Sequence, residues 1–237
     1  MQLFYNPNID TSTTEFTFGK EESRHIIRVL RKKEGDNLHL TNGKGILFLA
    51  KIINDSDKKC IINISSFEEK SKQWKYHLHI AIAPTKMNER YEWFLEKATE
   101  IGIDEITPII CDNSERKVIK QERMQKVIVS AMKQSLKFRL PKFNNPIPFS
   151  EFIQNELEGV KFIAHCENTD KKTLNELIEN SKNITVLIGP EGDFTTKEIT
   201  KALQHKFIPL SLGESSLRTE TAGIVACNTI SVLKNNS

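Results

Sequence analysis

The sequence predicts an α/β protein in two parts: a small β-barrel over residues 1–70 and an α/β domain with a mainly parallel sheet over residues 74–237. Short apolar runs separated by turn signals fill the first part, as in a small barrel. In the second part apolar runs alternate with helical patterns, which favours a mainly parallel sheet. A chain of 237 residues is long enough for two modest domains. The polar stretch at 68–73 between them is interpreted as a linker.

In the first part a short helix is expected over residues 21–30, followed by a β-hairpin. Strands at 38–40 and 46–50 flank Asn42-Gly43-Lys44-Gly45, whose turn residues tolerate positive φ. A further strand is expected at 60–64.

In the second part five strands alternate with five helices. Gly102 is placed as a helix C-cap, and Thr173 with Glu176 and Thr195 with Glu198 fit capping boxes. The expected strands are 77–83, 106–111, 162–166, 185–188 and 207–212, and the expected helices are 89–101, 122–138, 174–180, 196–205 and 220–233.

Composition and charge narrow the class of protein. No apolar stretch approaches the ~20 residues of a membrane-spanning helix, and the N-terminus lacks the features of a signal peptide, so we expect a cytoplasmic protein without a membrane partner. Basic residues gather at 24–33 and 116–139. These runs indicate either solvated helix faces or a polyanionic partner.

The four cysteines are far apart in the sequence and form no CxxC pair, so buried free thiols are expected. His77 and His79 alternate on one strand, but no third ligand lies near them in the sequence. We therefore expect no metal site.

Polar or glycine-rich loops follow four of the predicted strands, at 84–86, 165–167, 189–192 and 211–213. The carboxyl ends of parallel strands meet at one edge of a sheet, where such loops form a small-molecule site. Glycines let a ligand approach the backbone closely, and proline stiffens the loop. A plain strand-to-helix turn is the alternative, and the loops match neither the GxGxxG nor the P-loop pattern.

The last helix opens with Arg218-Thr219-Glu220. Thr219 is placed as its N-cap, and Glu220 complements the positive end of the helix dipole. An arginine fits such an end poorly unless an anion or carboxylate is near, so Arg218 is the candidate functional residue.

Several ordered motifs resemble those of the bacterial ribosomal RNA uridine-N3 methyltransferases of the SPOUT class. They are Gly189-Pro-Glu-Gly-Asp-Phe194, Ser211-Leu-Gly213 and Leu217-Arg-Thr-Glu-Thr-Ala222. Further matches lie at 25–31, 97–102, 131–135 and 140–141, so the resemblance covers the whole chain. There are two departures. Asp193 stands where the family usually has a second glycine, and Ser215-Ser216 stand where it has an Arg-Ile pair.

This resemblance implies a PUA-like, RNA-binding barrel, a trefoil-knotted SPOUT domain, a homodimer and S-adenosylmethionine as cofactor. The reaction implied is methylation of N3 of a uridine in 16S ribosomal RNA of the small ribosomal subunit. The cofactor-binding residues implied are Leu187, Gly189, Pro190, Glu191, Gly192, Leu210, Leu212, Gly213, Leu217, Thr219 and Ala222.

For catalysis we expect Arg218 to stabilise the anion at the uracil oxygens and Glu220 to act as an orienting carboxylate or base. His165 is a second candidate base, and Glu191 either organises its loop or faces the sulfonium charge. Phosphate contacts are expected from basic residues of the barrel and the 116–139 stretch. The RNA-binding candidates are Arg24, Arg28, Arg31, Arg116 and Lys117.

Two other functions stay open. In one, the chain is a non-catalytic RNA-binding protein whose cofactor loops are vestigial; the intact loops speak against this. In the other, the SPOUT scaffold acts on a ribose 2′-oxygen or on a guanosine of transfer RNA. The N-terminal barrel favours the ribosomal target, by analogy with the family.

Overall fold

The computed structural model describes residues 1–178 and 181–235, which form two compact units. The first unit consists of Met1–Lys72 and Met132–Leu140. The second consists of Gln73–Ala131 and the described residues of Pro141–Ser237. Within these ranges no helix combines the length and the apolar character needed to cross a membrane.

The first unit is built on a five-stranded mixed sheet in the order β1-β3-β4-β5-β2. β1 (Leu3–Tyr5) is parallel to β3 (Asn37–Thr41), whereas β4 (Ile46–Asp55), β5 (Cys60–Glu69) and β2 (Glu15–Thr17) pair antiparallel. The predicted hairpin is confirmed as β3–β4. The predicted linker is wrong at its start, because Glu68 and Glu69 pair with Leu47 and Ile46 as the end of β5.

The predicted helix at 21–30 is present but is not uniformly α-helical. α1 (Lys20–Arg24) continues into η1 (His25–Val29), a π-helical turn, and Arg31 follows with φ 54°. Ile26 of η1 is fully buried and packs into the core inside the sheet, which includes Phe48. π-Helical turns are rare, and this one contributes Ile26 to the core of the first unit.

The segment at 132–140 packs against the β3–β4 hairpin of the first unit. The Phe138 carbonyl accepts from the Gly45 N–H at 2.8 Å, and the Leu140 N–H donates to the Gly43 carbonyl at 2.9 Å. α3 (Gln121–Gln134) therefore ends four residues before the predicted boundary at 138. Leu136 adopts φ 53°, a left-handed conformation that does not continue a right-handed helix.

The second unit contains an eight-stranded sheet in which every pair is parallel, which confirms the predicted α/β class. All five predicted strands are present to within two residues, and three short strands are additional. The order is β11 (Lys172–Thr173), β13 (Ile208–Ser211), β10 (Val160–Ala164), β12 (Asn183–Ile188), β6 (His77–Ile82), β7 (Glu105–Ile110) and β8 (Lys142–Phe143), with β9 (Ile147–Pro148) also paired to β7.

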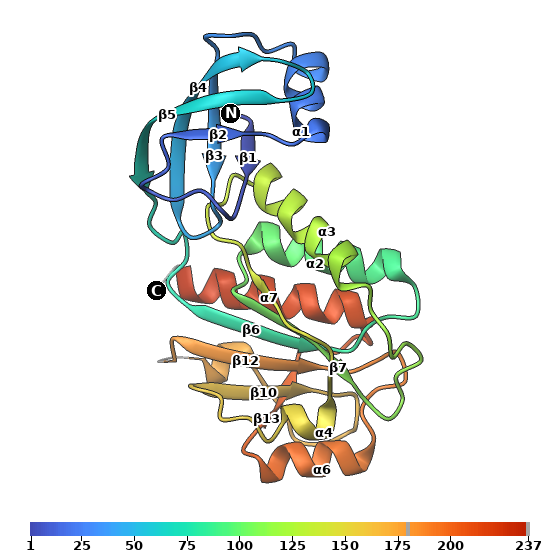
Figure 1. Cartoon of the computed structure of the whole chain (residues 1–237). Helices are drawn as coiled ribbons and strands as arrows, with labels where there is room; N and C mark the ends of the chain where they lie inside the picture. Colours follow the sequence, from blue (N-terminus) through green and yellow to red (C-terminus); the bar gives the residue numbers. More distant parts are fainter. Residues whose placement is uncertain (179–180, 236–237) are drawn as a thin grey trace. The chain divides into compact units, whose positions relative to one another are not determined.

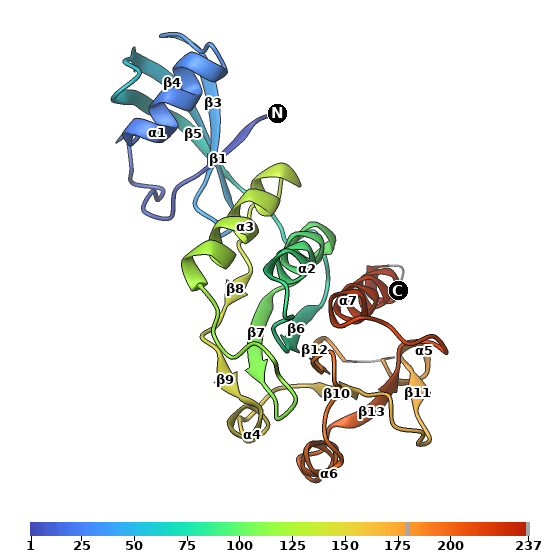
Figure 2. The same ribbon diagram turned by 90° about the vertical axis from the view of Figure 1, so that its right-hand side faces the viewer.

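Helices cover both faces of this sheet (Figures 1 and 2). α2 (Asn88–Ile101) and α7 (Thr219–Asn235) lie on one face, and α4 (Phe149–Phe152) and α6 (Thr196–Gln204) lie on the other. α4 has no counterpart in the sequence prediction. The predicted helix at 174–180 begins as α5 (Leu174–Leu177), and residues 179–180 of it lie outside the described residues.

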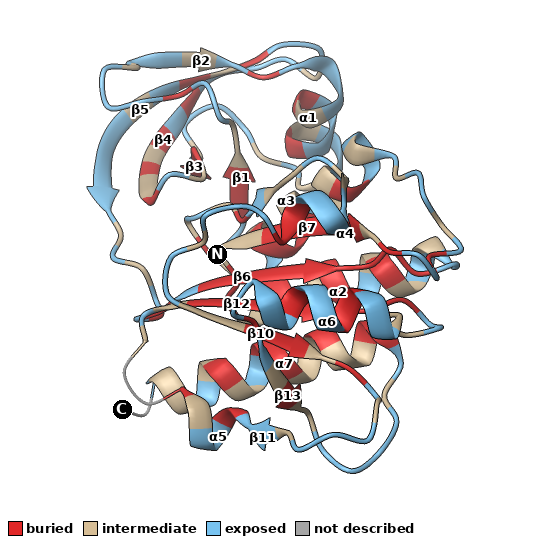
Figure 3. Ribbon diagram, turned by 90° about the horizontal axis from the view of Figure 1, so that it is seen from below, coloured by how far each residue is buried: buried red, intermediate tan, exposed pale blue. Residues whose placement is uncertain are grey.

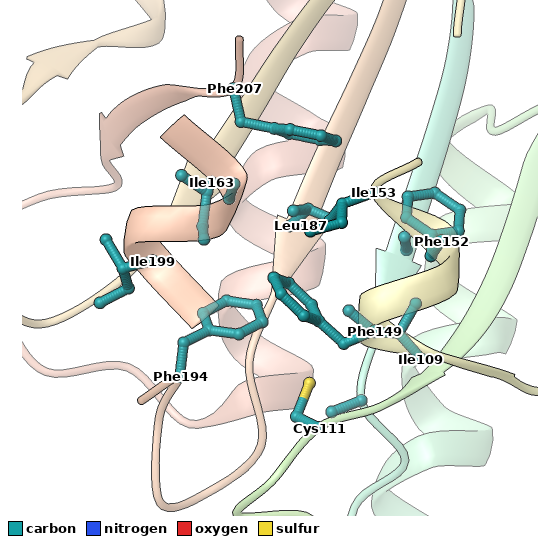
Figure 4. Close-up of a cluster of buried hydrophobic side chains, with 13 residues drawn as sticks. Ile109, Cys111, Phe149, Phe152, Ile153, Ile163, Leu187, Phe194, Ile199 and Phe207 are labelled. Carbon is teal, nitrogen blue, oxygen red and sulfur yellow. The ribbon is translucent and has the colours of Figure 1, made fainter. Parts of the chain in front are cut away.

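Each face of the sheet has its own packing. Under α4 and α6, Leu187 of β12 contacts a cluster that includes Phe149, Phe194 and Phe207 (Figure 4). On the other face, a Cβ at Gly223 would come within 2.8 Å of the Phe94 ring and 3.0 Å of Ile82. Glycine at this position therefore lets α7 pack closely on α2 and β6. The buried residues accordingly concentrate on the strands and the inward helix faces (Figure 3).

The helix ends mostly follow the predicted signals. Both capping boxes are confirmed, at Thr173 and at Thr195, and Gly102 ends α2 with φ 130°. The prediction for Thr219 is wrong: it is the first residue of α7, and the Arg218 carbonyl already accepts from the Ala222 N–H at 2.8 Å. The helical ladder thus starts one residue earlier than predicted.

Candidate active site

Two adjoining pockets lie at the carboxyl edge of the parallel sheet, beside the start of α7. The first, which we call the leucine pocket, has a volume of about 260 Å³ and is formed by the ends of β10 and β13 with the segment leading into α7. Its lining residues are Ala164, His165, Cys166, Lys171, Leu210, Ser211, Leu212, Gly213, Glu214, Ser215, Ser216, Leu217 and Ala222.

The leucine pocket has an apolar wall and a polar rim. Leu210, Leu212 and Leu217 form the wall, which suits a flat uncharged ring. Lys171 and Glu214 supply charges of opposite sign in the same lining. A zwitterionic ligand with an aromatic part matches this combination of groups.

His165 is a buried residue of the leucine pocket. Both of its ring nitrogens are buried, and neither has a hydrogen-bond partner among the described residues. Burial, and then the charge of Lys171, lower the pKa of His165, so the ring is neutral at neutral pH. Because buried polar atoms are normally paired, two unpaired nitrogens in a pocket lining indicate a ligand site.

The second pocket, which we call the arginine pocket, is larger, at about 670 Å³. Ser216 and Leu217 line both pockets, so this short segment separates them. The remaining lining comes from the first turns of two neighbouring helices, with Glu89, Arg90 and Trp93 on α2 and Arg218, Glu220 and Thr221 at the start of α7.

Glu220 is the buried charge of the arginine pocket. Its side chain is 7% exposed, and its Oε1 lies 3.9 Å from Nε of Arg90. Its Oε2 is buried and has no hydrogen-bond partner within residues 1–178 and 181–235. Arg218 is exposed, and no ion pair joins its guanidinium to any described residue. A carboxylate oxygen and a guanidinium are thus available to a ligand in one pocket.

The structure brings together five of the residues expected to bind a cofactor. Leu210, Leu212, Gly213, Leu217 and Ala222 line the leucine pocket.

The other six lie outside this lining. Leu187 packs in the core under α4 and α6, Gly189, Pro190 and Thr219 are buried, and Glu191 and Gly192 are exposed. The Glu191 carboxylate accepts from the Lys86 N–H at 2.9 Å, so it organises the neighbouring strand-end loop.

The basic residues expected to bind RNA differ in how exposed and how free their side chains are. Arg24 and Arg31 are exposed, and Arg28 pairs with Asp57 at 2.8 Å while remaining 69% exposed. Lys117 is exposed, whereas Arg116 donates hydrogen bonds to the carbonyls of Thr85 and Lys86. Arg116 therefore stabilises a loop.

Arg90 and Trp93 were not identified as site residues from the sequence, although their position in the sequence indicated the sheet edge. Both lie in the first turns of α2, directly after the polar loop that follows β6 at the sheet edge. Lys171 was missed because β11, which orders its surroundings, is only two residues long.

The cysteines and histidines carry no metal-binding arrangement in the part of the chain that the structure describes. Cys60, Cys111 and Cys227 are buried free thiols, and Cys166 is exposed. The ring of His79 is 2.7 Å from the Thr107 hydroxyl, and burial lowers the pKa of His79 to about 4.

Comparison with known families gives matches in both units. The profile described as "RNA methyltransferase domain" matches residues 72–231, and the one described as "RNA methyltransferase PUA domain" matches residues 18–65. The chain is 34% identical over 233 residues to ribosomal RNA small subunit methyltransferase E of Buchnera aphidicola, covering 94% of this chain and 90% of that protein.

Solved structures extend these similarities to the whole fold. A protein of Porphyromonas gingivalis, described as a probable rRNA-methyltransferase, matches with a TM-score of 0.93 and 42% identity, covering 100% of this chain and 99% of the other. Ribosomal RNA small subunit methyltransferase E of Neisseria gonorrhoeae, bound to S-adenosyl methionine, matches with a TM-score of 0.88 and 25% identity over 98% of both chains.

Proposed function

Since this chain belongs to the RNA methyltransferase family, we propose that it is an S-adenosylmethionine-dependent enzyme that methylates N3 of a uridine in 16S ribosomal RNA. The observation that carries this proposal is the arginine pocket beside the leucine pocket. Its lining contains the unpaired Glu220 oxygen and the guanidinium groups of Arg90 and Arg218, which suits a nucleobase that must lose a proton and carry negative charge.

The leucine pocket fits the cofactor. Its apolar wall suits the adenine ring, and the unpaired nitrogens of His165 suit the polar edge of a nucleoside. Lys171 and Glu214 match the carboxylate and the ammonium of the methionine part. When bound, S-adenosylmethionine supplies a methyl group on a positively charged sulfur. Contacts to the cofactor from Leu187, Gly189, Pro190, Glu191, Gly192 and Thr219 stay predictions.

The arginine pocket would hold the uracil. Glu220 Oε2 would take the proton from N3 of the uridine, which frees the N3 electron pair to form the bond to the methyl group. The methyl group would part from the cofactor sulfur, which leaves as a neutral thioether. Arg218, with Arg90, stabilises the charge that develops on the uracil oxygens. His165, neutral in the adjoining pocket, is the alternative proton acceptor. Much of the rate then comes from holding N3 in line with the methyl group.

We assign RNA binding to the basic residues of the PUA-like domain, residues 1–70, and catalysis to the SPOUT domain, residues 74–237. Arg24, Arg28 and Arg31 would contact phosphates without selecting sequence. A steep fall of RNA affinity with salt is expected, and a flat dependence, measured by filter binding between 50 and 200 mM salt, would contradict these contacts.

Four further properties belong to the same proposal. The protein acts as a homodimer with a trefoil-knotted catalytic domain, and it works in the cytoplasm on the small ribosomal subunit. These follow from the family resemblance. Sedimentation equilibrium tests the dimer, since a monomer at micromolar concentration would contradict it.

The decisive experiment is methyl transfer from labelled S-adenosylmethionine to small ribosomal subunits that lack the modification, followed by digestion to nucleosides. Label in 3-methyluridine supports the proposal. Label in a 2′-O-methylated nucleoside or a methylguanosine would move the reaction to another target. Absence of label, together with no rise in melting temperature on adding the cofactor, would favour a non-catalytic RNA-binding protein.

A further inference from the structure

Asp193 occupies an unusual backbone position in the loop after β12. Its φ is 59°, in the left-handed region that favours glycine, and aspartate and asparagine tolerate it better than most side chains. A glycine would adopt this conformation freely, so the aspartate needs a separate explanation. Its side chain provides one.

The Asp193 carboxylate accepts a hydrogen bond from the Cys166 N–H, with 2.7 Å between N and Oδ2. This short distance is typical of a charge-assisted bond. Cys166 follows β10 and, like His165, lines the leucine pocket. The bond therefore fixes one wall of that pocket from a different strand-end loop.

The same peptide unit is held from its other side as well. The Lys171 ammonium donates to the His165 carbonyl at 2.8 Å. The C=O of His165 and the N–H of Cys166 belong to one peptide plane, so Lys171 and Asp193 hold both of its polar groups with opposite charges. Fixing this plane limits the backbone rotation that would swing the His165 ring out of the pocket.

Two other carboxylates of the segment 189–198 make similar bonds. Glu191 accepts from the Lys86 N–H at 2.9 Å, and Glu198 accepts from the Asp112 N–H at 3.0 Å. The loop after β12 and the first turn of α6 thus hold the loops after β6, β7 and β10 in place. Of these three amide donors, only Cys166 belongs to a residue that lines the leucine pocket.

We propose that Asp193 is a positioning residue for the cofactor: through the Cys166 N–H it holds the His165–Cys166 peptide in the orientation that S-adenosylmethionine requires. This inference rests on the proposed function, because it concerns the pocket assigned to the cofactor. Asp193 is not itself a lining residue of the pocket; it acts through its hydrogen bond to Cys166, which lies after β10 and lines the pocket.

The test compares Asp193→Gly, Asp193→Asn and wild type. Glycine removes the side-chain oxygen that accepts from the Cys166 N–H but readily adopts the positive φ. Asparagine keeps a side-chain acceptor oxygen and also tolerates the positive φ. Asp112→Asn is the matched control, because it removes an exposed negative charge from the same sheet edge without removing a backbone N–H acceptor. Calorimetry gives the Kd for S-adenosylmethionine, and NMR gives the hydrogen-exchange rate of the Cys166 amide in the cofactor-free protein.

We expect Asp193→Gly to raise the Kd about tenfold and to speed exchange of the Cys166 amide by a similar factor. Asp193→Asn should stay within about threefold of wild type in both measurements, and Asp112→Asn should match wild type. Melting temperatures of all variants show that each one folds.

Three results would overturn the inference: unchanged Kd and exchange in Asp193→Gly, an equal loss in Asp193→Asn, or an equal loss in Asp112→Asn. The last two would assign the effect to charge alone. Failure of the proposed function is a separate result. If wild type binds no S-adenosylmethionine, the cofactor assignment falls, while unchanged Cys166 exchange in Asp193→Gly would still refute the hydrogen bond.

Discussion

The leucine pocket and the arginine pocket share one wall but differ in chemistry. The first is the smaller, with three leucines and a neutral histidine; the second is larger and contains the buried carboxylate of Glu220 beside Arg90, with Arg218 in the same lining. Strand ends and the segment leading into α7 form most of the first lining, whereas the first turns of α2 and α7 form most of the second. Because most residues line only one of the two pockets, we expect mutations to separate cofactor binding from stabilisation of charge on the substrate.

Arg218→Ala should have the largest effect and should act on one pocket alone. Without the guanidinium the uracil anion loses its main cation, so turnover should fall about 10³-fold. The Kd for S-adenosylmethionine should stay within about threefold, because Arg218 does not line the leucine pocket. Single-turnover methyl transfer and calorimetry measure the two quantities. A weakened cofactor affinity would contradict the separation.

Glu220→Gln should follow, with turnover reduced about 10²-fold. The amide cannot take the N3 proton, so the rate of the variant should rise with pH where that of wild type levels off. A pH–rate profile with saturating cofactor provides the measurement. If the variant keeps the wild-type profile, the proton goes elsewhere, and the same experiment on His165→Gln identifies whether His165 is the acceptor.

Leu217→Ala should affect both pockets, because Leu217 lines each of them. Loss of its apolar contact should weaken cofactor binding about tenfold, and the displaced wall should lower turnover by a similar factor at saturating cofactor. Leu203→Ala serves as the control, since Leu203 is 43% exposed on α6, on the other face of the sheet, and lines neither pocket. An effect on one pocket only would mean that the wall is not shared.

The smallest effect should be a pH dependence confined to the leucine pocket. Burial and Lys171 lower the pKa of His165, so the ring charges only below the ordinary value of 6.5. Cofactor affinity should be constant above pH 6.5 and should fall a few-fold toward pH 5, since an imidazolium repels the sulfonium. His165→Gln should remove this dependence in calorimetric titrations.

The lowered pKa of His165 also makes the free energy of unfolding depend on pH. The unfolded chain binds a proton at His165 more readily than the folded chain, so the contribution of neutral His165 is present above pH 6.5 and is lost as the pH falls. Denaturant unfolding of wild type and His165→Gln at pH 7.5 and pH 5.5 measures it. A steeper loss of stability in the variant than in wild type would contradict the assignment.

Local signals predicted the framework of the second unit well. The alternation of apolar runs located every long strand, and the capping boxes at Thr173 and Thr195 located two helix starts. These features depend on residues that are neighbours in sequence, which is why they could be recognised there. The motif around Arg218 and Glu220 indicated the edge of the sheet where both pockets lie.

Features that depend on distant contacts could not be predicted. The burial of Glu220 depends on packing at the start of α7, and its proximity to Arg90 depends on α2 lying beside α7. The early end of α3 and the return of residues 132–140 to the first unit depend on hydrogen bonds to Gly43 and Gly45. Periodicity within a segment carries no information about such partners.

The divided first unit also limits how this protein can be exchanged in pieces. A gene cut after residue 72 would encode the sheet without the segment at 132–140, leaving the Gly45 N–H and the Gly43 carbonyl without their partners. Fusion of residues 1–72 to another protein would therefore transfer the first unit without its segment at 132–140. A complete first unit would require residues 1–72 to be joined to residues 132–140. The first unit is therefore expected to be inherited together with the second unit and not as a separate domain.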